Sequence, residues 1–295
     1  TLRVTMPTPI RRRALLRAAA ALPALTAVPW VAGSQASSSS PARAPSALPS
    51  VSVLPPLDMP GLDRMRTLRL CLPPSYARDT GRRYPVVYMH DGQNLFDDAT
   101  SYAGEWGVDE TMAALAQASG FEAIVVGIDN GAERRMTELN PWDHERFGAG
   151  EGRAYLRFLV DVVKPFVDAR WRTLPGRDHT AVIGSSMGGL ISHAALLMHP
   201  QVFGRAGVVS PAYWTAPPVF DLAAATPLPA PARVLLTMGT GEGERALKDV
   251  RRMHTLLQPA WGERVALREF DGAPHNEGAW RTQLPGVLRW LFEIG

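Results

Sequence analysis

Cysteine is almost absent from this 295-residue chain, which contains one, Cys71. A single cysteine cannot form an intramolecular disulfide. A packed core must therefore hold the fold, and the chain is long enough to bury a sizeable one. Residues 67–72 alternate between polar and apolar side chains as a strand does, with Leu68, Leu70 and Leu72 facing the core. That pattern turns Cys71 to the opposite face, so we expect no catalytic role for it.

Long apolar runs and metal-binding clusters are also lacking. The apolar run at residues 18–31 is shorter than the roughly 20 residues of a membrane-spanning helix, and Pro23 and Pro29 interrupt it, which argues against a stable membrane span. No group of His, Cys and Asp residues recurs at metal-ligand spacing, so we expect no metal ion and no cofactor. We find no internal repeat and no sign of a second folded domain.

The first part of the chain differs in composition from the rest. Three arginines at 11–13 precede the apolar run, and small residues at 34–36 follow it, so residues 1–36 are predicted to be a signal peptide. The arginines resemble a twin-arginine signal, with the Sec route as the alternative. Residues 37–54, rich in Ser, Ala and Pro, are predicted to be a disordered linker before one domain at 55–295. We therefore expect an exported protein, periplasmic or secreted.

Net charge excludes one class of partner. The chain has 31 basic and 28 acidic residues, but five arginines and no acidic residue precede position 37. The remainder therefore has 26 basic against 28 acidic residues, a formal net charge of −2. The high isoelectric point belongs to the leader, and we expect no nucleic-acid partner.

The segment at 184–188 reads Gly-Ser-Ser-Met-Gly, a G-x-S-x-G pattern. A short β-branched stretch at 180–183 precedes it, and an Ala- and Leu-rich stretch at 189–198 follows it. Strand, G-x-S-x-G and helix together predict a nucleophile elbow centred on Ser186. The serine would lie at a helix N-terminus, where backbone N–H groups stabilise an anion. The alternative is a simple turn in which Ser186 caps the helix, which predicts no matching histidine or acid downstream.

A histidine follows in the expected order. His275 lies in a turn-rich loop at 271–276, after an alternating strand pattern at 264–270. A helix is predicted over residues 277–294, with Pro285 expected to kink or divide it. His275 is thus placed to take the proton of the serine hydroxyl and return it to the leaving group.

The acid is expected after the preceding strand, predicted at 232–238. Glu242 and Glu244 both follow it, and we favour Glu242 because it is closer to the end of the strand. Either carboxylate would orient the imidazole and stabilise its charged form. The alternative for both is a solvated carboxylate in the first turn of a helix, a common position for Glu.

Two backbone N–H groups are expected to stabilise the oxyanion that develops on a substrate carbonyl. One belongs to Met187, directly after the serine. The other is predicted at Gln93, in the loop after a strand at 84–89. His90 and Asp91 in the same loop are expected to hold it by side-chain hydrogen bonds.

Arg134 and Arg135 follow a predicted strand at 122–128, on the side where the carboxyl ends of strands open to an active site. Either could bind a substrate carboxylate, phosphate or siderophore oxygen. Equally open is an ion pair that only shapes the loop. The acids considered for that pair are Glu133, Glu138 and Asp143.

Aromatic residues in predicted loops are the remaining candidates for substrate contact. Trp142, soon after the two arginines, is the one we assign to substrate binding. The same loops hold Trp106, Tyr213 and Trp214. These rings would line an aromatic pocket or, equally, pack as partly buried residues.

The predicted strands and helices alternate along the chain, which indicates an α/β fold with a mostly parallel central sheet and helices on both faces. Residues 88–97, 127–131 and 133–142, together with 184–189 and the Pro274-His275 loop, resemble the putative esterase family of α/β-hydrolases. That family is similar to enterochelin esterases, feruloyl and acetyl-xylan esterases, esterase D and the antigen 85 mycolyltransferases. The resemblance covers about residues 55–293.

The resemblance implies a serine carboxylic-ester hydrolase that works through an acyl-enzyme on feruloyl, acetyl-sugar or siderophore esters, and the predicted signal peptide adds that it is exported. It implies Ser186 as nucleophile and His275 as base, and it supports Gln93 as a donor. It also supports Glu242, because the acid of the family commonly follows a Gly-Thr pair. The alternatives are an acyltransferase of the antigen 85 type and a non-catalytic member that binds a carbohydrate or siderophore. The oligomeric state is not readable.

Overall fold

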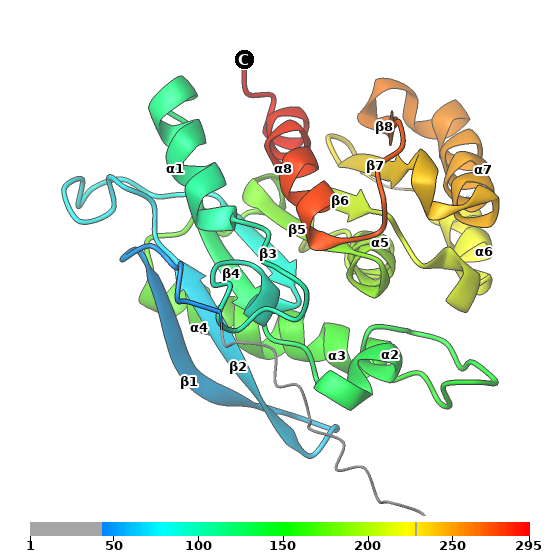
Figure 1. Cartoon of the computed structure of the whole chain (residues 1–295), viewed down its shortest axis with the longest axis horizontal. Helices are drawn as coiled ribbons and strands as arrows, with labels where there is room; N and C mark the ends of the chain where they lie inside the picture. The colour runs from blue at the N-terminus through cyan, green and yellow to red at the C-terminus, as the bar shows by residue number, and fades with distance from the viewer. Residues whose placement is uncertain (1–42, 228) are drawn as a thin grey trace, which may run out of the picture. The chain divides into compact units, whose positions relative to one another are not determined.

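One sheet organises the part of the chain that the structure describes, residues 43–227 and 229–295 of a computed structural model (Figure 1). The predicted signal peptide at 1–36 lies outside the described residues. The strands are β1 (Val51–Met59), β2 (Arg64–Cys71), β3 (Val86–His90), β4 (Ile124–Ile128), β5 (Thr180–Ser185), β6 (Arg205–Val209), β7 (Arg233–Gly239) and β8 (Val265–Phe270). The helices are α1 (Val108–Ser119), α2 (Arg135–Glu138), α3 (Gly152–Phe158), α4 (Lys164–Arg170), α5 (Met187–Met198), α6 (Pro218–Ala225), α7 (Glu244–Trp261) and α8 (Glu277–Phe292).

The order of strands across the sheet is β1-β2-β4-β3-β5-β6-β7-β8. The pairs β1–β2 and β2–β4 are antiparallel, and every other pair is parallel. The mostly parallel sheet predicted from the sequence is confirmed. Parallel neighbours need crossover connections, and helices between successive strands provide them.

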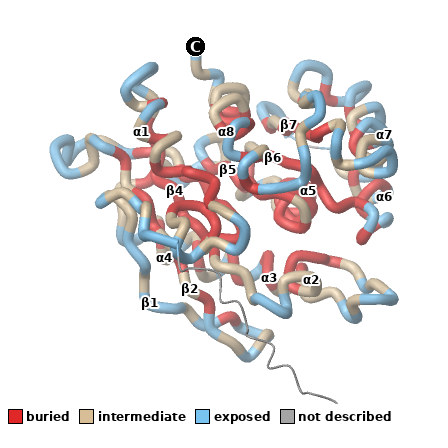
Figure 2. Tube along the Cα trace, in the orientation of Figure 1, coloured by how far each residue is buried: buried red, intermediate tan, exposed pale blue. Residues whose placement is uncertain are grey.

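Helices cover the sheet on both faces (Figure 1), and buried residues follow its central strands (Figure 2). Side-chain alternation along the strands builds a core on each face. In β3, Val86 and Tyr88 belong to one buried cluster and Val87 and Met89 to the other. The first cluster is completed by residues of α3 to α7, and the second by residues of α1 and α8. Each fully buried apolar side chain contributes roughly 1.5–3 kcal/mol, so both layers stabilise the sheet.

The site region follows from the strand order. Strand β3 pairs with β4 on one side and with β5 on the other. Connections that leave β3 and β5 therefore diverge, which opens a crevice at the carboxyl ends of these strands. The segments after β3 and β5 hold Gln93 and Ser186, two predicted site residues that are far apart in sequence.

The predicted linker at 37–54 ends earlier than expected. Residues 51–54 form the start of β1, an edge strand that the sequence analysis missed. Pro55 and Pro56 hide the strand pattern, and the pairing register shifts between Leu54 and Leu57. An edge strand tolerates proline at such an irregularity because one row of its N–H groups needs no ladder partner.

Pro285 does not divide the C-terminal helix as expected, since α8 runs unbroken from Glu277 to Phe292. Proline inside a helix costs roughly 3 kcal/mol because it removes a hydrogen bond and crowds the preceding turn. Leu284, Leu288 and Leu291 of this helix are fully buried against the sheet. Burial of three leucines exceeds that cost, so the helix continues through the proline.

Candidate active site

Ser186 lies at the sharp turn between β5 and α5. Its φ and ψ angles are 57° and −116°, a conformation that non-glycine residues seldom adopt. The turn is so close that a Cβ atom on Gly184 would lie 2.7 Å from the backbone of Gly188. A Cβ on Gly189 would lie 2.6 Å from the carbonyl oxygen of Val209. The glycines are therefore sterically required, and strain at the serine is of the kind that functional sites retain.

His275 and Glu242 are joined by a hydrogen bond of 2.6 Å between Nδ1 and Oε2. The Glu242 side chain is 1% exposed, whereas that of His275 is 44% exposed. Glu244, the other candidate acid, is exposed at the first turn of α7. An ionised Glu242 accepts a hydrogen bond from Nδ1–H, and Nε2 of the imidazole then carries the lone pair that can accept a proton.

Glu242 is held by three donors. Its Oε1 accepts hydrogen bonds from the Ser210 hydroxyl at 2.6 Å and the Gly239 N–H at 2.8 Å. Burial acts to raise the pKa of Glu242, but the hydrogen bonds from His275, Ser210 and Gly239 outweigh it and lower the pKa. The carboxylate therefore stays ionised at neutral pH in spite of its burial.

Ser210 and Trp280 support this pair, and the sequence analysis missed both. Ser210 adopts φ 44° directly after β6. Its hydroxyl accepts a 2.9 Å hydrogen bond from the indole N–H of Trp280 while it donates to Glu242. The rings of His275 and Trp280 meet edge to face, with centroids 4.9 Å apart. The position of Ser210 at a strand end was the signal that could have identified it.

The segment after β3 forms a 3₁₀ turn, Gly92–Asn94, that carries Gln93. A Cβ on Gly92 would lie 2.6 Å from Oδ1 of Asp129, so the turn requires glycine there. The Gln93 side chain accepts a 2.9 Å hydrogen bond from the N–H of Asn130, which ties the turn to the segment after β4. Met187, the other predicted donor, is the first residue of α5, next to Ser186.

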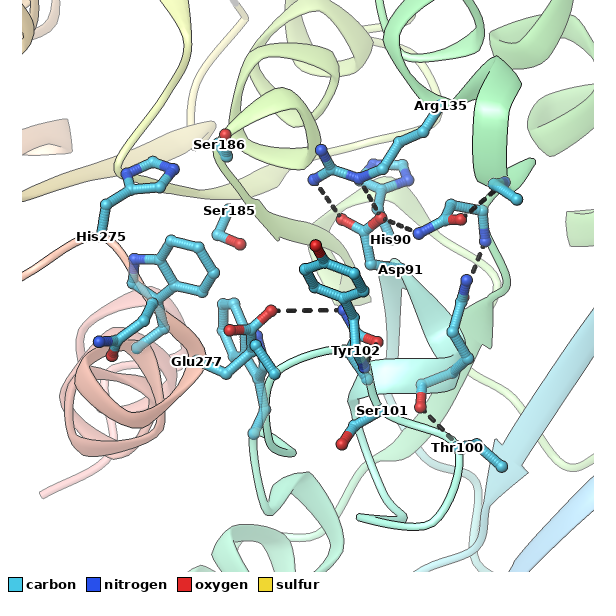
Figure 3. A pocket seen from close by; sticks show the side chains of 18 residues that line it. His90, Asp91, Thr100, Ser101, Tyr102, Arg135, Ser185, Ser186, His275 and Glu277 are labelled. Atoms are coloured by element: carbon cyan, nitrogen blue, oxygen red, sulfur yellow. Dashed lines mark hydrogen bonds and ion pairs between the residues drawn. The ribbon is translucent and has the colours of Figure 1, made fainter. Parts of the chain in front are cut away.

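A cavity of about 860 Å³ brings these segments together. Ser186 and His275 lie at one end, and Gln93 belongs to the lining as well (Figure 3). Trp106 and Trp280 supply buried aromatic surface, while Tyr102 is 90% exposed at the rim. The remaining lining residues are His90, Asp91, Asn94, Thr100, Ser101, Ala103, Asn130, Ala132, Arg135, Ser185, Asn276 and Glu277.

Arg135 lies in the cavity wall, but its ion-pair partner differs from the three acids considered. Its Nε and Nη2 atoms donate to Asp91 Oδ1 and Oδ2 at 2.5 and 2.9 Å. Asn130 also donates to Asp91, at 2.7 Å. Burial acts to raise the pKa of Asp91, but the charge of Arg135 and the hydrogen bonds from Arg135 and Asn130 together outweigh it and lower the pKa, so the carboxylate is ionised. Asp91 holds its loop as predicted, with an arginine as partner.

Arg134 and Trp142 do not line this cavity. Arg134 is exposed at the end of a 3₁₀ turn, and Trp142 is half-buried against the larger core. Glu138, one of the acids considered for the arginines, is buried and pairs with Arg64 and Arg66 of β2. These partners lie more than 70 residues away in sequence, beyond the reach of a local pattern.

His90, the last residue of β3, lines the cavity and is anchored by a hydrogen bond to the larger core. Its Nδ1 atom shares a 2.7 Å hydrogen bond with the hydroxyl of Tyr155. Burial lowers the pKa of His90 to about 4, so the imidazole is neutral at pH 7. Its Nε2 atom is buried without a partner among the described residues.

Residues 43–227 and 229–295 contain neither a metal-binding cluster nor a helix that could span a membrane. No group of three or more His, Cys, Asp or Glu side chains is arranged to hold a metal ion. Within the same residues, no helix has both the length and the apolar character to cross a bilayer.

The chain matches one family model and is similar in sequence to known proteins. The family model described as putative esterase matches residues 60–291. The chain is 29% identical to the uncharacterized protein YbbA of Bacillus subtilis (strain 168) over 242 residues, which are 77% of this chain and 92% of that protein. It is 32% identical to a siderophore triacetylfusarinine C esterase of Aspergillus fumigatus over 144 residues, which are 46% of this chain and 47% of that enzyme.

A solved structure agrees in fold. The BES protein from Bacillus cereus superimposes with a TM-score of 0.68 and 18% sequence identity, over 83% of this chain and 95% of that one. At this identity the likeness shows the fold alone, which is the predicted α/β-hydrolase fold.

Proposed function

Because the chain belongs to the putative esterase family and is a carboxylic ester hydrolase, we propose that Ser186, His275 and Glu242 form its catalytic triad. The observation that carries the proposal is the hydrogen bond between His275 and the buried Glu242, on the cavity that Ser186 also lines. In this mechanism the Ser186 hydroxyl attacks the ester carbonyl while Nε2 of His275 takes its proton. The alcohol leaves with that proton, and an acyl-enzyme remains.

Water then resolves the acyl-enzyme. His275 takes a proton from the water, the hydroxide attacks the acyl carbonyl, and the proton returns to Ser186 as the acid departs. Glu242 orients the imidazole and stabilises its cationic form in both halves of the reaction. The hydrogen bonds from Ser210 and Gly239 keep Glu242 in place for that task.

The N–H groups of Met187 and Gln93 are the proposed oxyanion donors. Met187 begins α5, so its N–H is not used by the helix ladder and the helix dipole adds to its effect. Gln93 comes from the turn after β3, across the crevice between β3 and β5. Donors fixed before the reaction begins cost no reorganisation when charge develops on the carbonyl oxygen.

The proposed substrates are esters of small molecules or of carbohydrates. The relative named as a siderophore triacetylfusarinine C esterase supports a siderophore ester as one class. Of the three predicted substrate contacts, Arg135 is retained because it lines the cavity, whereas Arg134 and Trp142 are placed outside it. Export through the basic and apolar segment at 1–36 is part of the proposal and rests on sequence alone.

Initial rates on a panel of esters test the triad. The panel contains acetyl, butyryl, feruloyl, acetylated-sugar and siderophore-type esters, with wild type, Ser186→Ala and Ser185→Ala compared. We expect Ser186→Ala to lower kcat by about four orders of magnitude or more, because the nucleophile is lost. The neighbouring Ser185→Ala should retain most turnover. Equal losses in both variants, or none in Ser186→Ala, would reject the assignment.

A further inference from the structure

Glu277 is a buried carboxylate that the proposed mechanism does not use. It is the first residue of α8, two positions after His275, and it lines the cavity near Tyr102 (Figure 3). Its exposed fraction is 8%. Among the described residues its carboxylate has one hydrogen bond, a long one of 3.4 Å from the Asn94 amide, and no ion pair.

Such a carboxylate is costly where it stands. A buried charge without a counter-ion or several donors destabilises a protein by kilocalories per mole. The start of α8 offsets only part of that cost, since a helix N-terminus stabilises a single nearby charge weakly. The Asn94 amide is held in its orientation because its Oδ1 accepts the Tyr102 N–H at 3.0 Å, and its Nδ2 group stays 3.4 Å from Glu277. Glu277 therefore has acceptor capacity left toward the cavity.

Charge balance in the cavity limits what Glu277 can meet. Asp91 and Arg135, the oppositely charged pair in the lining, neutralise each other through their two hydrogen bonds. Glu277 is then the acidic residue of the lining without an ion pair among the described residues, and an anionic substrate group beside it would be repelled. A cationic substrate group is disfavoured as well, because the positive charge of Arg135 would repel it. Arg135 is close enough to matter, since the charge of Glu277 contributes to the raised pKa of the Arg135 guanidinium.

A neutral hydrogen-bond donor is repelled neither by Glu277, as an anion would be, nor by Arg135, as a cation would be. Hydroxyl groups donate to a carboxylate without bringing a positive charge near Arg135, and they accept from neighbouring donors. In the cavity lining, the Nδ2 group of Asn94 is such a donor, because its one hydrogen bond is the long one to Glu277. The Thr100 and Ser101 hydroxyls donate to backbone carbonyl oxygens, so their own oxygens serve as acceptors. The polarity of this end therefore matches a substrate that carries hydroxyl groups.

We propose that Glu277 is a specificity-determining residue that accepts hydrogen bonds from hydroxyl groups of the ester substrate. The proposal rests on the proposed esterase function and adds a substrate class to it, namely hydroxylated esters. Ser186 and His275 act on the ester group, while Glu277 recognises hydroxyls on the part of the substrate that reaches toward Tyr102.

The test compares kcat/KM for matched esters in wild type and Glu277→Gln of the full chain. One pair, 2,3-dihydroxypropyl butyrate and propyl butyrate, differs on the alcohol side. A second pair, ethyl 3-hydroxybutyrate and ethyl butyrate, differs on the acyl side. Butyrylcholine supplies a cation with no hydrogen-bond donor. Glu244→Gln is the matched control, because Glu244 occupies the first turn of α7 and is exposed.

We expect wild type to prefer the hydroxylated ester in at least one pair, and Glu277→Gln to reduce that preference at least tenfold. Hydrogen bonds to a charged group are worth about 1.5–3 kcal/mol, which corresponds to that factor or more. Glu244→Gln should keep the preference. An unchanged ratio in both pairs overturns the proposal, as does a selective loss of butyrylcholine turnover, which would assign a cation site.

A second readout separates this proposal from the triad. In a Ser186→Ala background, calorimetry measures the dissociation constants of the same esters without turnover. Glu277→Gln should weaken binding of the hydroxylated ester about tenfold relative to its plain counterpart. If the wild type turned over no ester, the esterase proposal would fail, yet this binding difference would still decide the role of Glu277.

Discussion

Two glutamates flank His275, and they differ in how fully their carboxylates are satisfied. Glu242 receives hydrogen bonds from His275, Ser210 and Gly239, all between 2.6 and 2.8 Å. Glu277 receives one, from Asn94 at 3.4 Å. Both are largely buried, so burial alone does not distinguish them. A carboxylate with several short hydrogen bonds is fixed in position, which suits a residue that orients a base. A carboxylate with one long hydrogen bond can still accept others, which suits recognition of a substrate.

Among the variants around these two glutamates, His275→Ala should lower kcat the most. His275→Ala removes the base and leaves Glu242 with an unused oxygen at the cavity end. We expect kcat to fall by about four orders of magnitude, as in triads that lose their base. Steady-state kinetics on the best ester would measure it, with circular dichroism to establish that the fold is intact. A loss below tenfold would mean that another group serves as the base.

Glu242→Gln should have the next largest effect. The amide can still accept from Ser210 and Gly239, but it donates to Nδ1 of His275 and so favours the wrong imidazole tautomer. We expect kcat to fall about a thousandfold with little change in KM. Glu244→Gln, two residues away and exposed, is the control. Equal activity of the two variants would contradict the role given to Glu242.

A buried histidine provides a smaller and separate effect. His90 also has one hydrogen-bond partner, Tyr155, and one buried atom without a partner among the described residues, Nε2. Burial lowers the pKa of His90 to about 4, so the imidazole is neutral in the folded protein at pH 7. Between about pH 6.5 and 4 the unfolded chain binds a proton at this residue that the folded protein does not. The contribution of His90 to stability should therefore fall as the pH falls through that window, by about 3 kcal/mol at most, and change no further below it.

Urea unfolding at pH 7.0 and 4.5 would measure this contribution. Buried His193, whose pKa is lowered to about 3, adds a fall of the same sign. Glutamine at position 90 does not titrate, so His90→Gln should show a smaller loss of stability between the two pH values than wild type. An equal loss in both proteins would show that His90 is not held neutral by the fold.

Local patterns in the sequence were sufficient for the residues that lie directly after strands. Ser186 was predicted from a strand, two spaced glycines and a helix, and Glu242 from its distance to the end of a strand. In the structure both residues follow the ends of their strands, β5 and β7, and the parallel pairing brings these strand ends to one edge of the sheet. The mostly parallel architecture was predictable for the same reason, since buried strands are short apolar runs.

Partners far apart in sequence were not predictable. Arg135 pairs with Asp91 across 44 residues, and Trp280 donates to Ser210 across 70. No periodicity or spacing encodes such contacts, because they depend on which loops the sheet brings together. Strand β1 was missed because its two prolines break the pattern, and Glu277 was passed over as an ordinary residue at a helix start.

Active-site labelling tests the central claim, that His275 and Glu242 activate Ser186, most directly. The full chain would be treated with a fluorophosphonate, and the modified residue would be identified by peptide mass spectrometry. One adduct on Ser186 is predicted in wild type, with a labelling rate that falls at least a hundredfold in His275→Ala. A label on another residue, or an undiminished rate on Ser186 in His275→Ala, would contradict it.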